Sequence, residues 1–180
     1  MIVPLILNAL LGTKIKVIAG YEPGQGDTIA MESREVNGVY GLAWSTIKAS
    51  RAHWIRHKKI NIFVQMVIEK LPDLPDVPSA LDLVSGDNRQ ILELTLIRQE
   101  LGRPFVAPPG VLAEREEALR QAFQATLRDQ EFVTEARQGQ LDIEPLNGQR
   151  IDEQLAGAYG SPRAIIDTAA LLLNPPAGEK

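Results

Sequence analysis

The sequence contains no cysteine, few aromatic residues and no excess of positive charge. Without cysteine, the chain has no disulfide bonds, no thiolate nucleophile and no cysteine ligands for zinc. Aromatic residues make up only 5% of the chain, so Leu, Ile, Val and Ala must fill the core. The net charge of −4 argues against a protein that wraps nucleic acid, because such proteins are usually strongly basic.

Long apolar runs are also missing. No stretch reaches the roughly 18 apolar residues that a membrane-spanning helix needs. The apolar segment 1–11 has no basic region before it and no small-residue cleavage site after it, which is unlike a signal peptide. We predict that this segment forms a helix of the core, and that a gene product starting at Met1 is cytoplasmic.

The composition is typical of a folded protein, since the 180 residues are 44% apolar and 23% charged. Alternating or continuous apolar residues predict strands at 14–18, 36–42, 60–68, 104–110 and 141–145. Amphipathic spacing and capping residues predict helices at 4–11, 27–34, 87–101, 113–127, 130–139, 149–159 and 162–173. The basic segment 48–59 is predicted to be helical or a loop.

Strand, glycine-rich loop, helix and strand follow one another over residues 14–42, which predicts a βαβ unit with parallel pairing. The three prolines of segment 71–78 fix φ and remove backbone donors, so this segment is predicted to be an extended surface connection. The sequence therefore predicts an α/β fold, with a parallel or mixed sheet and flanking helices.

Three segments resemble a known family. They are LGTKIKVIAGYEPGQG at 11–26, LPDLPDVPS at 71–79 and FVAPPG at 105–110, the last followed by an amphipathic helix. Their sequence and order are similar to those of the periplasmic substrate-binding proteins of tripartite tricarboxylate transporters, the Bug-type solute receptors. The proline-rich segment 71–79 is the most specific of the three, and their order and rough spacing agree with the family's across nearly the whole chain.

The resemblance implies a periplasmic-binding-protein-like fold in which two α/β lobes close over a small carboxylate. By this alignment, residues 1–100 are the second, ligand-binding lobe with its βαβ unit, and 101–173 are the mostly helical C-terminal part of the first lobe. The architecture is thus a truncated two-lobe one, with a disordered tail at 174–180. The resemblance also implies a periplasmic location and delivery of the carboxylate to a membrane permease, without chemistry.

The loop at 20–27 is the first candidate site. It is predicted to follow a parallel strand and open a helix, where backbone amides and the helix dipole favour anions. Gly24 and Gly26 would let the backbone approach a carboxylate, and Tyr21 and Thr28 would add hydroxyl donors. The neighbouring candidates are Gln25 and Asp27, although the charges of Glu22 and Asp27 oppose an anion. The alternative is an ordinary turn, and the loop matches no nucleotide-binding motif.

A second group of candidates follows the next predicted strand. Parallel pairing would bring Trp44, Ser45 and Thr46 to the same crevice as the first loop. The alternative for Trp44 is a core or hinge aromatic. We expect these residues and the loop to bind a carboxylate together.

The remaining motifs predict no catalytic residues, no metal site and no cofactor. His53 and His57 share a helix face but have no third ligand nearby in sequence. The basic residues of 48–59, with Trp54 among them, could contact phosphates, but a solvated helix face is the simpler interpretation. Glu114, Glu116 and Glu117 complement the dipole at the start of a helix.

Three functions are compatible with these observations. The first is a solute-binding protein, or a truncated paralogue of one, that takes up a carboxylate. The second is a structural or interaction protein that forms a homodimer through the surface left by the missing half-lobe. The third is a small α/β enzyme acting on a phosphorylated substrate, which the lack of a P-loop lysine disfavours. We therefore expect no enzymatic activity and no nucleic-acid partner.

Overall fold

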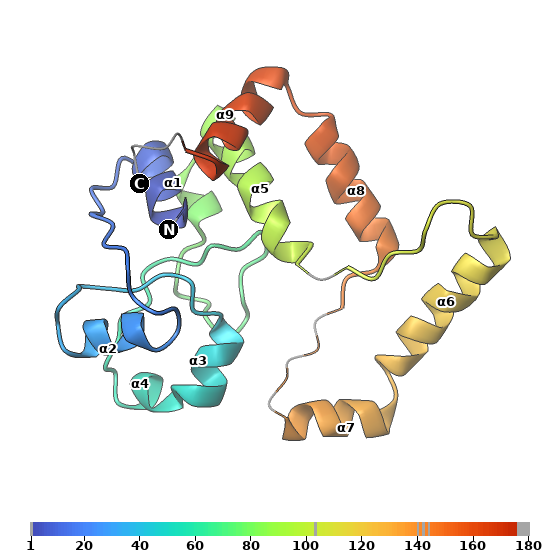
Figure 1. Ribbon diagram of the computed structural model, residues 1–180, viewed down its shortest axis with the longest axis horizontal. Helices are drawn as coiled ribbons and strands as arrows, with labels where there is room; N and C mark the ends of the chain where they lie inside the picture. The colour runs from blue at the N-terminus through green and yellow to red at the C-terminus, as the bar shows by residue number, and fades with distance from the viewer. Residues whose placement is uncertain (1, 103, 140, 142, 144, 176–180) are drawn as a thin grey trace.

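A computed structural model describes residues 2–102, 104–139, 141, 143 and 145–175. Within these ranges the chain is helical and forms no sheet (Figure 1). The helices are α1 (Ile2–Leu11), α2 (Gly26–Glu32), α3 (Trp44–Ser50), α4 (Ala52–Arg56), the 3-10 helix η1 (Ala80–Leu83), α5 (Gly86–Glu100), α6 (Ala113–Thr126), α7 (Gln130–Gln138), α8 (Gly148–Tyr159) and α9 (Arg163–Leu173). The predicted α/β fold of the binding-protein type is therefore wrong.

The predicted helices are confirmed, and local chemistry explains their ends. Pro4 stands in the first turn of α1, where its missing N–H is not needed. Gly12 ends α1 with a φ of 66°, a left-handed conformation that glycine adopts without strain. Asp129 caps α7, and its side chain accepts hydrogen bonds from the backbone N–H groups of Glu131 and Phe132. The predicted segment 48–59 divides between α3 and α4.

The segment 14–18, predicted to be a strand, pairs with no other strand in the described residues, and a side chain explains why. The Asn8 amide donates to the carbonyl oxygen of Ile15 at 2.9 Å, and its oxygen accepts from the Ile15 N–H at 2.8 Å. Asn8 therefore occupies both backbone groups that a neighbouring strand would use. Alternation predicted correctly that Ile15 and Val17 are more buried than Lys14 and Lys16, but not what they pack against.

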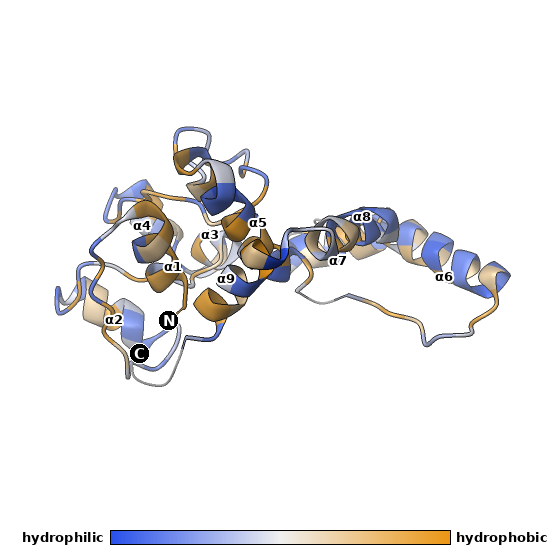
Figure 2. Cartoon of the chain, turned by 90° about the horizontal axis from the view of Figure 1, so that it is seen from above, coloured by the Kyte–Doolittle hydropathy of each residue, from blue (hydrophilic) through white to orange (hydrophobic). Residues whose placement is uncertain are grey.

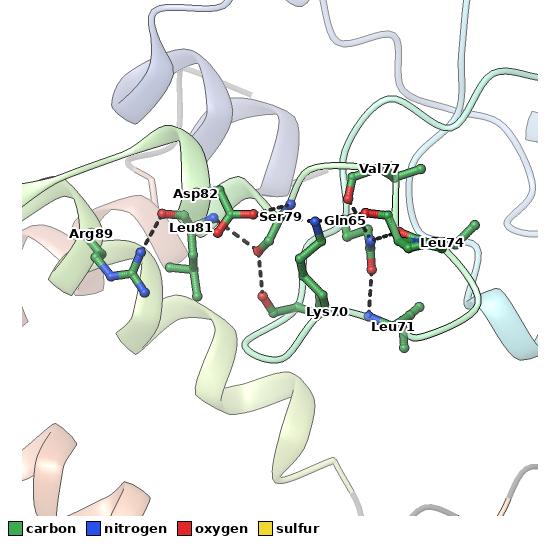
Figure 3. A network of polar contacts seen from close by, with 11 residues as sticks. Gln65, Lys70, Leu71, Leu74, Val77, Ser79, Leu81, Asp82 and Arg89 are labelled. Carbon is green, nitrogen blue, oxygen red and sulfur yellow. Dashed lines mark hydrogen bonds and ion pairs between the residues drawn. The ribbon is translucent and has the colours of Figure 1, made fainter.

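The predicted buried strand at 60–68 pairs with the rest of the described chain only at an isolated parallel bridge between Gln65 and Ser79. Pro78 lies next to the bridge and lacks the N–H that would extend a ladder. The Gln65 side chain instead binds the carbonyl oxygens of Leu74 and Val77 and the N–H of Leu71, as Figure 3 shows. The proline-rich segment therefore forms a loop whose backbone contacts the Gln65 side chain.

The other strand predictions fare as follows. Segments 36–42 and 104–110 contain no strand or bridge pairing in the described residues, so these strand predictions are wrong as well. Residues 142 and 144 of the predicted strand 141–145 lie outside the described residues, as do residues 176–180 of the predicted tail. The division into lobes at 100 and 101 stays a prediction.

The core lies between α1, α5 and α9, which pack side by side in Figure 1. Its largest cluster joins α1 and α5 to the bridge and η1 through Ile6, Leu7, Met66, Ala80, Leu81, Leu92 and Leu96. A second cluster joins α5 to α9 through Ile91, Ile165 and Ala169. Each fully buried Leu or Ile contributes about 1.5–3 kcal/mol. We call residues 2–102 and 163–175 the body.

The segment 104–139, which carries α6 and α7, stands away from the body (Figure 2). We call it the arm. Helix α8 connects the arm back to the body, where Arg150 pairs with Glu69 at 3.2 Å and the Gln154 amide donates to Glu100. None of the residues of α6, all of which are described, is buried. The arm is therefore a pair of helices with very little core of its own.

Candidate functional site

The predicted ligand loop at 20–27 is a largely exposed turn that leads into α2. Gly20 and Gly24 have φ angles of 107° and 83°, which other residues rarely adopt, and the space around both is open. Asp27 lies inside the first turn of α2 and not at its N-cap, which is Gln25. Since no parallel strand precedes the loop, it lacks the sheet edge on which the carboxylate prediction depends.

The hydroxyl group of Tyr21 is already bound within the protein. It donates a hydrogen bond to Oε1 of Glu35 at 2.7 Å. This hydrogen bond raises the pKa of Tyr21, because ionisation would remove the donated proton beside a carboxylate. The Tyr21 hydroxyl, which was predicted to donate to a ligand, instead links the two ends of segment 21–35, which contains α2.

Thr28 and Gly24 both contact Arg51, a basic residue that was not among the predicted ligand residues. The Thr28 side chain is 1% exposed, and its hydroxyl donates to the carbonyl oxygens of Gln25 and Gly24. Nη2 of Arg51 donates to that hydroxyl at 3.2 Å and to the Gly24 carbonyl at 3.4 Å. Arg51 therefore ties the loop to the junction between α3 and α4.

Trp44 lies at the opposite end of α3. Its Nε1 donates to Oδ2 of Asp73 at 2.8 Å, and Nζ of Lys48 lies 3.1 Å from the same oxygen. The hydrogen bond from Trp44, followed by that from Lys48, lowers the pKa of Asp73. Trp44 thus anchors the proline-rich connection at 71–78 to α3.

The predicted site residues therefore form two groups and not one. Arg51 follows Trp44 by seven positions, which is about 10 Å along the axis of α3. Ser45 is half-buried in α3, and the exposed Thr46 offers its carbonyl oxygen to the Ser50 hydroxyl at 2.9 Å. Gly24, Gln25, Gly26 and Thr28 lie with Arg51, whereas Trp44 lies with Asp73. Whether either group binds a carboxylate stays a prediction.

The contact of Asp73 predicts a pH-dependent stability. Because the pKa of Asp73 is lower in the folded state than its ordinary value of 3.8, the contacts of the Asp73 carboxylate stabilise the fold at pH values above 3.8. This stabilisation is lost as the pH falls through the pKa of the folded state. We expect Asp73→Asn to lower the urea midpoint at neutral pH, and the difference from wild type to disappear in acid. Asp76→Asn, in the same connection, is the control. A difference that persists unchanged at every pH would contradict the assignment.

The basic segment 48–59 is organised around a buried tryptophan. Trp54 is 1% exposed, and its Nε1 donates to Oε1 of Glu32 at 2.7 Å. The Arg51 guanidinium lies over the same ring, 5.2 Å from its centroid. Trp54 therefore joins α4 to α2, and it is not exposed for stacking against a base. In the described residues, no three His, Cys, Asp or Glu side chains gather as metal ligands do.

Several large apolar side chains of the arm are exposed. The exposed fractions are 86% for Phe105, 83% for Val106, 61% for Leu119, 55% for Leu112 and 37% for Phe123. The rings of Phe105 and Phe123 pack against each other with centroids 5.1 Å apart. We call these five residues the arm surface. The amphipathic spacing of 113–127 predicted an apolar face, and in the structure this face is exposed apart from the contact of Phe123 with Phe105.

A hollow of about 320 Å³ lies where α6 meets α7. It is lined by Ala125, Thr126, Asp129 and Phe132. Asp129 bounds it with the same carboxylate that caps α7. The hollow is thus a feature of the arm, far along the chain from the predicted ligand loop.

The exposed area of the whole chain is large for its mass. A compact monomer of 19.8 kDa exposes about 8,600 Å² of surface. This chain exposes 12984 Å². The chain therefore leaves more surface exposed to solvent than a compact monomer of the same mass does.

Comparison with known protein families, curated proteins and solved structures finds no match to this chain. Among the described helices, none has the length and apolar character that crossing a membrane requires.

Proposed function

We propose that this protein is a non-catalytic interaction module, and that two copies associate through the arm surface. The observation that carries the proposal is the unpaired arm: its helix α6 has no buried residue, yet it presents Leu119 and Phe123 to solvent. Monomeric proteins rarely leave a continuous apolar patch uncovered. A second copy offers the same patch in return.

The large exposed area of the chain supports association of two copies. A stable protein–protein interface buries about 800 Å² on each partner. The chain exposes roughly 4,400 Å² more than a compact monomer of its mass, several times the area that such an interface needs. Covering the arm removes apolar side chains from water, which favours association, while the loss of translational and rotational freedom opposes it.

The body supports the same assignment. Its polar side chains at the predicted carboxylate site hold helices together: Tyr21 binds Glu35, and Arg51 binds Thr28 and Gly24. The arm surface, by contrast, has side chains with no such internal role. A carboxylate ligand, a permease partner and a periplasmic location stay predictions.

Sedimentation velocity at micromolar protein concentration tests the proposal. We expect a species of about twice the chain mass of 19.8 kDa, because the arm surfaces of two copies cover each other. Dilution should return the mass to that of one chain. A strict monomer throughout the micromolar range would refute the proposal.

A further inference from the structure

The dipeptide Asn-Gly occurs twice in the chain, at Asn37–Gly38 and at Asn147–Gly148. Asparagine is one of the thermolabile side chains, because the backbone nitrogen of the next residue can attack its amide carbon. Glycine in the next position favours this attack, since it has no Cβ to obstruct the approach and its backbone adopts many conformations. Both pairs therefore have the same intrinsic chemistry, and their surroundings decide how fast each one reacts.

The first pair lies in an irregular segment between α2 and α3, where Asn37 and Gly38 are both exposed. Within the described residues, the Asn37 side chain makes no hydrogen bond and the N–H of Gly38 has no acceptor. A Cβ added to Gly38 would meet no atom within 4 Å beyond its chain neighbours. The amide of Asn37 and the nitrogen of Gly38 are therefore free to approach each other.

The second pair lies at the start of α8, where a hydrogen bond holds it. Asn147 is the N-cap, and its side-chain oxygen accepts from the N–H of Arg150 at 2.8 Å. Gly148 is the first residue of the helix, and a Cβ added there would lie 3.6 Å from Nε of Arg120. Attack by the Gly148 nitrogen turns the Asn147 amide away from Arg150, so the capping hydrogen bond must be lost before the reaction.

We propose that Asn37 is a site of spontaneous deamidation, and that its capping role protects Asn147. In the reaction the Gly38 nitrogen loses its proton and attacks Cγ of Asn37. A new C–N bond forms, the bond from Cγ to the amide nitrogen breaks, and ammonia leaves. Water then opens the cyclic imide at either of its carbonyl groups, which gives aspartate or isoaspartate at position 37.

The reaction adds a negative charge to a part of the chain that has none. Residues 36–68 contain no Asp or Glu, and they carry five Lys or Arg residues. Because Asn37 is exposed, the new carboxylate stays in water, and we expect the modified chain to keep its melting temperature. The site lies in the body and not in the arm, so the proposal is independent of the proposed function.

Incubation of the folded, full-length chain at mildly alkaline pH tests the proposal, because base removes the proton from the attacking nitrogen. Peptide mass mapping over time measures the mass gain that accompanies replacement of NH2 by OH at each asparagine. Loss of an N-cap corresponds to a rate lower by about 2-fold to 30-fold, so position 37 should react faster than position 147 by a factor of this size or more. Equal rates, or faster reaction at position 147, would refute the proposal.

Two controls separate structure from sequence. In urea both pairs lose their surroundings, and positions 37 and 147 should react at similar rates; a lag at 147 that persists undiminished would show that the cap is not the cause. Gly38→Ala fills open space at a position without a positive φ, so the variant should fold as wild type does. Its Cβ obstructs the attack, and deamidation at position 37 should slow. An unchanged rate would contradict attack by the nitrogen of residue 38.

Discussion

Replacing Leu119 with glutamate is expected to convert the associated protein into a monomer. The substitution places a charge on each copy within the arm surface, where association would remove it from water. Burying a charge without a partner costs about 2 kcal/mol or more. Because a symmetric interface contains the residue twice, we expect the dissociation constant to rise by about 100-fold to 1,000-fold. Sedimentation equilibrium over a concentration series measures it.

The chain offers a matched control for this prediction. Leu171 on α9 is 62% exposed and Leu119 is 61% exposed, so Leu171→Glu makes the same change at equal exposure on the body. Both variants should unfold within about 0.5 kcal/mol of wild type, since neither residue is buried. Equal dissociation constants for the two variants would show that the arm surface is not the interface.

The helices were predictable because their signals are local. Capping and spacing act within one or two turns, as Asp129 does for α7 and Gly12 does for the end of α1. The strands were not predictable in the same way. A strand is stabilised by a partner that can lie anywhere in the chain, and alternation at 14–18 specifies only which side chains face inward.

Two amide side chains explain much of the difference between the predicted strands and the structure. Asn8 binds both backbone groups of Ile15, and Gln65 binds three backbone groups of the segment 71–77. Each amide takes the place of a neighbouring strand for the residues that it contacts. The sequence contains no signal for this, because an isolated Asn or Gln within an apolar run is equally compatible with a solvent-facing position.

The resemblance to the solute receptors failed at the fold for a related reason. Its three segments are connections and turns, and proline and glycine determine their conformation locally. Such a segment can form a similar loop whether or not a sheet adjoins it. The prediction that Trp44 lies near the loop at 20–27 depended on a sheet, and the described residues form none. The sequence did predict the apolar face of 113–127, but it does not indicate what covers this face.

Replacing Leu92 with alanine is expected to be the most destabilising of the changes considered. Leu92 is 1% exposed and belongs to the cluster that includes Ile6 and Leu7 of α1. Truncating a buried leucine costs about 2–5 kcal/mol, because transfer free energy is lost and a cavity remains. For a chain of this length, the melting temperature should fall by about 5–15 °C. Thermal unfolding followed by circular dichroism, at one protein concentration for all variants, measures the change.

Leu171→Ala is the control, since it removes the same atoms from an exposed position on α9 and should change stability by less than about 0.5 kcal/mol. Equal melting temperatures for the two alanine variants would place the core elsewhere than between α1, α5 and α9. The mass of Leu92→Ala below its transition adds a second result. Since the arm contributes none of the residues that pack with Leu92, the folded variant should still associate, and loss of association without unfolding would show that body and arm are energetically coupled.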